Sequence, residues 1–259
     1  MKREIDVICF SGTGNTKRVV DRMIDILNQN DITINQISER KPYVHEKGRE
    51  ILLAFPINSQ AVSPYIWKYM KALPDGSGDK IHVVATLNAS EAILAPLKKI
   101  LISKNYVPQG AIEISMPNNL LAGPDTTYQR LQAAKVQAEK FANDMVLNQD
   151  TWKEEKKGSA FVSFLSRDTI LPWVTMRMFN RLETDTENCK KCGLCVKECP
   201  VQNIRMEEFP VHQKQCQFCM RCAVVCQNGA IHFKGNKKLQ IRSIEQSEQQ
   251  AADKLAESN

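Results

Sequence analysis

Apolar residues recur along residues 1–149 with two alternating spacings. Short runs in which every residue or every second residue is apolar predict β-strands. They lie at residues 5–10, 32–37, 51–55, 81–85 and 111–115. Between them, apolar residues at helical spacing predict a helix that carries Val19, Val20, Met23, Ile24 and Leu27, and further helices at 64–73, 91–104 and 125–148.

Five β-α units in about 150 residues predict an α/β fold, because strands that alternate with helices form a parallel sheet covered on both faces. Right-handed crossovers then favour a doubly wound sheet of five strands. In such sheets ligands bind at the edge where the strands have their carboxyl ends. We therefore expect any binding site of residues 1–149 in the loops that follow these strands.

Residues 150–183 interrupt this pattern and are interpreted as a connector. The segment is polar at 152–159 and then apolar, with Ile170, Val174, Met178 and Leu182 at i, i+4 spacing. This spacing predicts a helix with one apolar stripe, which most often packs in a core or between domains. A partner surface or a helix at a membrane interface is the alternative interpretation.

The chain ends in a cysteine-rich zone, residues 184–236, and a polar tail, residues 237–259. The cysteine-rich zone has too few apolar residues for a conventional core, so covalent or coordinate bonds must stabilise it. The polar composition of the tail predicts a frayed surface helix or disorder. The sequence thus divides into a domain at 1–149, the connector at 150–183, a small domain at 184–236 and the tail.

Eight of the nine cysteines form two runs with the same spacing. Three thiols at i, i+3 and i+6 are followed by a fourth four residues later, and the whole run recurs after 27 residues. Three thiolates on one tight loop can each reach a different iron of a cubane, whereas the fourth iron needs a thiolate from elsewhere. Zinc sites use two Cys-x-x-Cys pairs, and they explain neither the third cysteine nor the repetition.

These runs resemble those of the bacterial two-cluster ferredoxins, in which the last cysteine of each run binds the other cluster. The resemblance implies two [4Fe-4S] clusters, each carrying one electron, and a small ferredoxin-like domain. The first cluster would take Cys189, Cys192, Cys195 and Cys226, and the second would take Cys199, Cys216, Cys219 and Cys222. Gln227 stands where that family often has a proline, which shapes a turn and is not a ligand.

Residues 11–16 lie between the first predicted strand and the first predicted helix. The glycines allow a tight turn around an anion, and the hydroxyl, amide and helix N-terminal groups supply donors, which predicts a phosphate-binding loop. The loop consists of Ser11, Gly12, Thr13, Gly14, Asn15 and Thr16. It matches neither the P-loop nor the Gly-x-Gly-x-x-Gly pattern. A turn that only caps the helix is the alternative.

In this strand–loop–helix context the six residues resemble the phosphate loop of flavodoxins, which binds FMN without relying on a basic side chain. The resemblance implies a flavodoxin-like fold for residues 1–149. It also implies that the loops after the third and fourth strands embrace the flavin ring, with Pro56, Ile57, Asn58 and Ser59 in one and Thr86, Leu87 and Asn88 in the other. The second loop departs from the family, which usually has glycines or an aromatic residue there.

Composition and charge narrow the classes of function further. Of 259 residues 42% are apolar, as in ordinary folded proteins, and the net charge of +6 is spread evenly along the chain. A nucleic-acid-binding arm would concentrate that charge, so we expect no nucleic-acid partner. Glu4 and Asp6 break any signal peptide, and no uncharged apolar run is long enough to span a membrane, so we expect a cytoplasmic protein. Dense cytosolic cysteines indicate metal ligands.

The whole chain therefore resembles fusions of a flavodoxin-like domain with a two-cluster ferredoxin domain. We expect an electron-transfer iron–sulfur flavoprotein that passes electrons between FMN, the clusters and a redox partner protein. A flavin-dependent reductase of a small substrate, supplied by the clusters, is the alternative, and a redox sensor without flavin is a third. The oxygen sensitivity of such clusters suggests an anaerobic habit. His45, His212 and His232 show no ligand spacing and are predicted at the surface.

Overall fold

The computed structural model describes residues 2–57, 62–87, 93–118, 124–152, 171–236, 239 and 241–257. Its larger sheet has five parallel strands in the order β2-β1-β3-β4-β5. These strands are β1 Glu4–Cys9, β2 Thr33–Ile37, β3 Glu50–Pro56, β4 Lys80–Leu87 and β5 Val107–Ser115. The predicted doubly wound α/β sheet is confirmed, and all five predicted strands are present.

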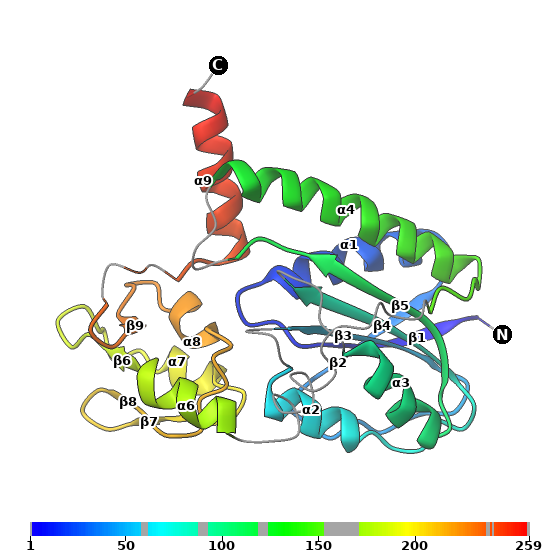
Figure 1. Cartoon of the computed structure of the whole chain (residues 1–259), viewed down its shortest axis with the longest axis horizontal. Helices are drawn as coiled ribbons and strands as arrows, with labels where there is room; N and C mark the ends of the chain where they lie inside the picture. The colour runs from blue at the N-terminus through cyan, green and yellow to red at the C-terminus, as the bar shows by residue number, and fades with distance from the viewer. Residues whose placement is uncertain are drawn as a thin grey trace.

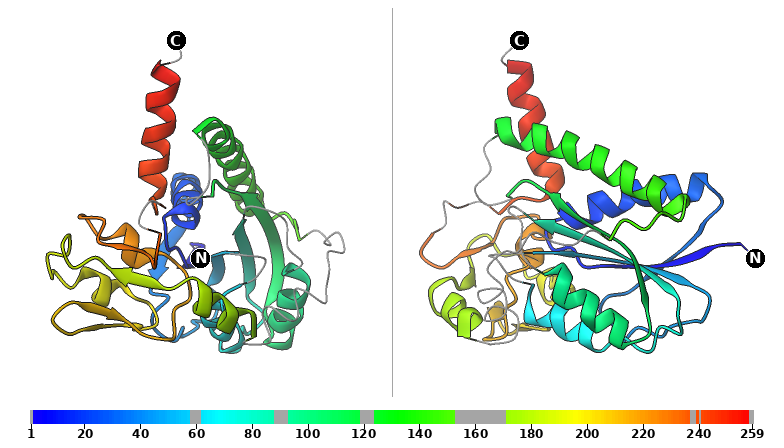
Figure 2. Two further views of the ribbon diagram at one scale, coloured as in Figure 1. Left: turned by 60° about the vertical axis from the view of Figure 1, so that its left-hand side comes forward. Right: turned by 45° about the vertical axis from the view of Figure 1, so that its right-hand side comes forward.

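Four helices cover the two faces of this sheet (Figures 1 and 2). Helices α1 Asn15–Gln29 and α4 Pro124–Val146 pack on one face, and α2 Pro64–Lys71 and α3 Leu94–Ser103 pack on the other. Along β3, Ile51, Leu53 and Phe55 join the core under α2 and α3, whereas Leu52 and Ala54 join the core under α1 and α4. Both faces of the strand are buried, which explains its continuous apolar sequence.

The cysteine-rich zone forms a separate small layer beside the carboxyl edge of the sheet (Figure 1). Two antiparallel ribbons frame it, one pairing β6 with β9 and one pairing β7 with β8. Its elements are β6 Leu182–Thr184, α7 Leu194–Glu198, β7 Ile204–Met206, β8 Pro210–His212, α8 Arg221–Val224 and β9 Ile231–Phe233. A small core of Trp173, Leu182, Ile204, Phe218 and Ile231 lies between the ribbons and the cysteine loops.

The connector contains a helix, α6 Leu171–Phe179, but the predicted apolar stripe is not its buried face. Val174 is 37% exposed and Met178 is 64% exposed, whereas Trp173 is 1% exposed. The helix is rotated by one position because Trp173 buries a larger apolar area, and Arg177, four residues on, donates from Nε to the Cys216 carbonyl oxygen at 3.0 Å. Ile170 lies outside the described residues.

The polar tail does not stay apart from the fold. Residues 244–257 form α9 Ile244–Glu257, which packs against α4. Ile244 and Ala251, two helical turns apart, are buried, and Ile244 belongs to the core under α1 and α4. Of the two expectations for the tail, the surface helix is present over residues 244–257, and its buried apolar residues dock it instead of leaving it frayed. In the described ranges, no helix has the length and apolar character needed to cross a bilayer.

At the amino edge of the sheet, Glu50 is held by Arg3 and His82. Arg3 donates to both carboxylate oxygens at 2.9 Å, and Nε2 of the buried His82 lies 3.2 Å from Oε2. Burial on its own would raise the pKa of Glu50, but hydrogen bonds from His82 and Arg3 outweigh it and lower that pKa to about 2. The ionised carboxylate therefore stabilises the fold.

We expect Glu50→Gln to remove a pH-dependent part of the stability. A depressed pKa stabilises the fold fully above the ordinary value of 4.5, and this contribution is lost as the pH falls toward 2. The variant should therefore unfold at lower urea concentration than the wild type at pH 7, and the gap should narrow below pH 4.5. A gap that stays constant from pH 7 to pH 3 would contradict the assignment.

Candidate functional site

The two cysteine runs adopt the same backbone conformation, residue for residue. Lys191, Gly193 and Gln202 have positive φ angles of 54°, 75° and 50°. Their equivalents 27 residues later, Phe218, Met220 and Gly229, have φ angles of 51°, 61° and 60°. Positive φ is uncommon for residues with a side chain, so its recurrence at matching positions indicates two copies of one loop design.

The same equivalence holds for hydrogen bonds to sulfur. In each run the first cysteine accepts from the backbone N–H two residues later, and the last accepts from the N–H four residues later. The four donor–acceptor pairs are Lys191–Cys189 at 3.4 Å, Phe218–Cys216 at 3.4 Å, Asn203–Cys199 at 3.2 Å and Ala230–Cys226 at 3.3 Å. Such donors stabilise thiolate sulfur and orient it toward the inside of the loop.

The sulfur atoms fall into two neighbouring groups that cross between the runs. The pKa of Cys195 is raised, first by burial and then by the thiols of Cys226, Cys189 and Cys192. The pKa of Cys222 is raised, first by burial and then by the thiols of Cys219, Cys216 and Cys199. The last cysteine of each run thus lies with the first three of the other run. These are the two sets that the ferredoxin resemblance implies, and their binding of iron stays a prediction.

A cavity of about 320 Å³, counted with the part open to solvent, lies inside the second group. Its lining includes all four thiols, Cys199, Cys216, Cys219 and Cys222, together with apolar side chains and His212. In the part of the chain that the structure describes, no three His, Cys, Asp or Glu side chains lie close enough together to hold a single metal ion.

His212 was predicted at the surface, and this prediction was wrong. Its Nε2 atom is buried and has no hydrogen-bond partner within the described residues. Burial lowers the pKa of His212 to about 4. His45 and His232 are also buried, His45 against Tyr43 and Asp79 and His232 beside the Phe233 carbonyl. A single polar residue in a short strand carries no sequence signal that could reveal such burial.

The predicted phosphate loop lies between β1 and α1, at the carboxyl edge of the sheet. Gly14, at φ 100°, is the last residue before the helix, and the Lys17 N–H donates to the Ser11 hydroxyl at 3.2 Å. The backbone N–H groups of residues 12–16 find no acceptor in the described part of the chain. Unpaired N–H groups at the N-terminus of a fifteen-residue helix are the donors that an anion site requires, and anion binding here stays a prediction.

The side chains of the loop are partly engaged with the sheet. The buried hydroxyls of Thr16 and Thr86 lie 2.7 Å apart, so one of the two keeps a proton to donate elsewhere. The Asn15 amide nitrogen donates to the Pro117 carbonyl at 2.9 Å, whereas its Oδ1 is buried without a donor. These contacts bring the loop after β1, the end of β4 and the start of the loop after β5 together at one point.

The other predicted flavin loops begin at the same edge. Pro56 ends β3, and the N–H of the buried Ile57 donates to the Thr86 carbonyl at 2.8 Å. Leu87 ends β4 and is buried. Asn58, Ser59 and Asn88 lie outside the described residues. The structure therefore places Ile57, Thr86 and Leu87 beside the phosphate loop.

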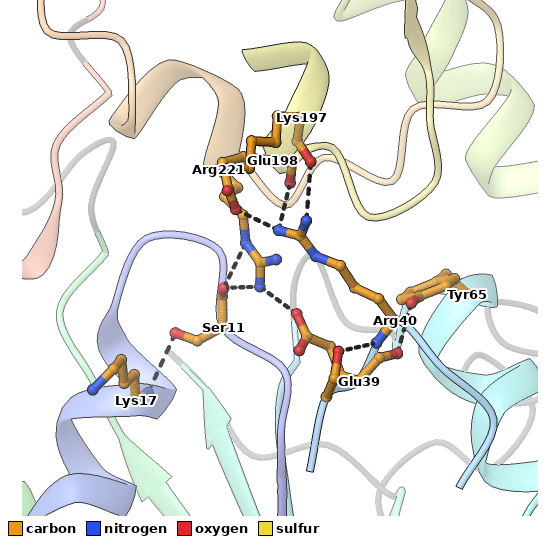
Figure 3. Close-up of polar contacts among 9 residues, drawn as sticks. Ser11, Lys17, Glu39, Arg40, Tyr65, Lys197, Glu198 and Arg221 are labelled. Atoms are coloured by element: carbon orange, nitrogen blue, oxygen red, sulfur yellow. Dashed lines mark hydrogen bonds and ion pairs between the residues drawn. The ribbon is translucent and has the colours of Figure 1, made fainter. Parts of the chain in front are cut away.

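The second cysteine loop lies directly on the phosphate loop (Figure 3). Arg221, between Met220 and Cys222, donates to the Ser11 carbonyl from Nε at 3.1 Å and from Nη2 at 2.6 Å, and it pairs with Glu39 at 2.9 Å. A Cβ atom on Gly12 would lie only 1.7 Å from the Cys219 carbonyl oxygen. Gly12 is therefore required for this approach as well as for the turn.

A second arginine makes the reciprocal contact from the other side. Arg40 donates to the carbonyl oxygens of Lys197 and Glu198, at 2.9 Å and 3.3 Å, and pairs with the Glu198 carboxylate. It thereby caps the C-terminus of α7. Sequence reasoning missed Glu39, Arg40 and Arg221, because isolated charged residues carry no motif and their pairing spans more than 150 positions.

The contacts break the symmetry of the two runs. Cys192 is exposed, whereas the equivalent Cys219 is shielded by the phosphate loop. The second group of cysteines therefore faces the parallel sheet, whereas Cys192 of the first group is open to solvent.

We expect Arg221→Met to destabilise the junction by about 2 kcal/mol, because charged hydrogen bonds to Ser11 and the half-buried partner Glu39 are lost together. Anaerobic urea unfolding measures this loss, and Arg205→Met, at an exposed position of β7, is the matched control. Iron content is assayed in parallel. Equal unfolding midpoints of the two variants would show that the contact adds no stability.

The 4Fe-4S binding domain family matches residues 182–205, which span β6, the first cysteine run and the start of β7. Together with the strand order of the parallel sheet, this match decides the architecture. The chain is a fusion of a flavodoxin-like sheet with a 4Fe-4S binding domain. The second cysteine run, residues 216–226, lies beyond the matched range.

Similar proteins each cover only part of this chain. An uncharacterised protein of Methanocaldococcus jannaschii is 38% identical over 53 residues, which is 20% of this chain and about a fifth (21%) of that protein. A flavodoxin from the domain Archaea has 15% identity and a TM-score of 0.40, covering 56% of the fusion and 99% of the flavodoxin. The Megasphaera elsdenii flavodoxin has 16% identity and a TM-score of 0.37, covering 54% of this chain and 98% of that flavodoxin.

Proposed function

We propose that the fusion is an electron-transfer iron–sulfur flavoprotein. Electrons pass between FMN in the loop of residues 11–16 and two [4Fe-4S] clusters, and on to a redox partner protein. The observation that carries this proposal is the direct contact of the Cys219–Arg221 segment with Ser11 and Gly12. It brings the second set of cysteines against the loop that would bind the flavin phosphate.

The loop residues fit FMN in three respects. The unpaired N–H groups of residues 12–16 suit a phosphate, which only accepts hydrogen bonds at its ionised oxygens. The spare hydroxyl proton of the Thr16–Thr86 pair can donate to the same group. The buried Asn15 Oδ1 needs a donor, which a sugar-alcohol hydroxyl would supply. When bound, FMN supplies the exchange of either one or two electrons.

The cysteines support one cluster at the exposed side and one at the junction. The first, with Cys189, Cys192, Cys195 and Cys226, would meet the partner protein, because Cys192 is exposed. The second, with Cys199, Cys216, Cys219 and Cys222, would occupy the cavity beside the phosphate loop. The two sets are neighbours, since Cys195 is among the thiols whose charge raises the pKa of Cys222. This order gives a path from partner to flavin.

Flash photoreduction tests this path. Anaerobic protein holding both cofactor types receives one electron from photoreduced deazaflavin, and absorbance is followed in time. We expect cluster bleaching first and its recovery as the flavin is reduced. The variant Cys216→Ser should abolish the second phase. Clusters that stay reduced beside oxidised flavin would contradict the proposal, and a flavin that a small substrate reoxidises directly would favour the reductase.

A further inference from the structure

One histidine lies among the cysteines of the junction. His212, the last residue of β8, lines the same cavity as Cys199, Cys216, Cys219 and Cys222. Apart from these thiols it is the only titratable side chain among the described residues that line the cavity. The other side chains there are apolar or uncharged, among them Leu182, Ile204 and Met220.

The position of His212 is fixed by the surrounding ribbon. It pairs with Ile204 across the β7–β8 ribbon, and the Thr184 hydroxyl donates to the Pro210 carbonyl at 2.8 Å. The next residue, Gln213, donates its N–H to the Asn203 carbonyl at 2.7 Å. These contacts fix the backbone of the ribbon from which His212 lines the cavity.

The Nε2 atom is left without a partner in this position. It is fully buried, and no described residue offers it a donor or an acceptor. A buried polar nitrogen without a hydrogen bond costs about 1–3 kcal/mol, so an isolated orphan is retained where something else satisfies it. The sulfur atoms of a cluster in the cavity would be acceptors for it, because His212 lines that cavity.

We propose that the Nε2–H group of His212 donates a hydrogen bond to a sulfur of the second [4Fe-4S] cluster and so sets its reduction potential above that of the first. This inference rests on the proposed second cluster. Reduction adds one negative charge to a cluster, and an N–H dipole aimed at sulfur stabilises the reduced form more than the oxidised form. An electron that enters at the exposed first cluster is then drawn toward the flavin.

At the position equivalent to His212, the first run has no such donor. The residue 27 positions before His212 is Asp185, an acceptor. Its carboxylate is engaged with the Glu187 N–H at 3.0 Å and the Asn188 amide at 3.2 Å. The asymmetry between two otherwise matching loops is thus specific to the junction side.

Redox titration followed by electron paramagnetic resonance tests the proposal in the full chain. We expect His212→Leu to lower the reduced-to-oxidised ratio of the second cluster about tenfold at fixed potential, which is about 59 mV for one electron. His212→Gln keeps an N–H donor and should restore part of the shift. His232→Leu is the matched control, because His232 is also buried with an orphan Nε2 but does not line the cavity.

A measurement on the wild type keeps the test valid if His212→Leu fails to assemble. With ¹⁵N-labelled histidine, electron spin-echo spectra of the reduced second cluster should show a coupled nitrogen that persists in His232→Leu. No coupling, or equal potentials in wild type and His212→Leu, would overturn the proposal. Only four irons per chain in the wild type would instead overturn the proposed second cluster itself.

Discussion

Gly12→Ala is expected to force the cysteine-rich zone off the phosphate loop. The new methyl group would lie 1.7 Å from the Cys219 carbonyl oxygen, far inside van der Waals contact. The methyl group is attached directly to Cα, and the oxygen belongs to the backbone. Neither can rotate away, so the junction must open or the loop must shift. Overpacking of this kind costs about 1–3 kcal/mol. We expect a larger radius of gyration by small-angle X-ray scattering and slower flavin reduction after a flash.

Gly48→Ala is the control for this variant. A methyl group there meets nothing within 4 Å, and its cost comes only from the positive φ of 90°. The control should lose some stability and keep the compact shape and the flavin reduction rate. If Gly12→Ala keeps both as well, the close approach of Gly12 to Cys219 does not join the two halves.

Cys199→Ser and Cys226→Ser are expected to remove clusters crosswise. Cys199 belongs to the first run but lies with Cys216, Cys219 and Cys222 around the cavity. Its loss should therefore abolish the second cluster, as Cys216→Ser does, and leave about four of about eight irons. Cys226→Ser should abolish the first cluster, as Cys189→Ser does. Iron analysis with paramagnetic resonance of each variant distinguishes the two clusters.

Cys9→Ser is the control for these variants. Cys9 is in β1 and belongs to neither run, and burial raises its pKa to about 12, as expected of an inert thiol. It should keep the full iron content. Pairing without crossing, in which Cys199→Ser and Cys189→Ser lose the same cluster, would contradict the assigned sets.

The fold could be predicted from the sequence because its signals are local. Each strand of the parallel sheet is a short apolar run, and the helix stripe from Val19 to Leu27 is buried as its spacing requires. The prediction failed where packing decides between nearby faces. In α6 the buried residue is Trp173, whereas the neighbouring Val174 and Met178 are exposed. In the polar tail, the buried Ile244 packs the helix onto the fold.

The site was predictable to the same extent. The cysteine spacing and the loop of residues 11–16 are local motifs, and the structure brings each together at a definite place. The junction between them was not predictable, because Arg221, Ser11 and Glu39 meet through the packing of segments that lie far apart in the sequence. His212 was missed for the same reason, since only the ribbon geometry directs it into the cavity.

The central claim is that one chain holds a flavin next to two clusters. The most direct measurement is an anaerobic determination of iron, sulfide and flavin per chain, with the ultraviolet–visible spectrum of the reconstituted protein. We expect about eight irons, as two four-iron cubanes require, with one FMN. Eight irons without flavin would contradict the role of residues 11–16, and zinc in place of iron would contradict electron transfer altogether.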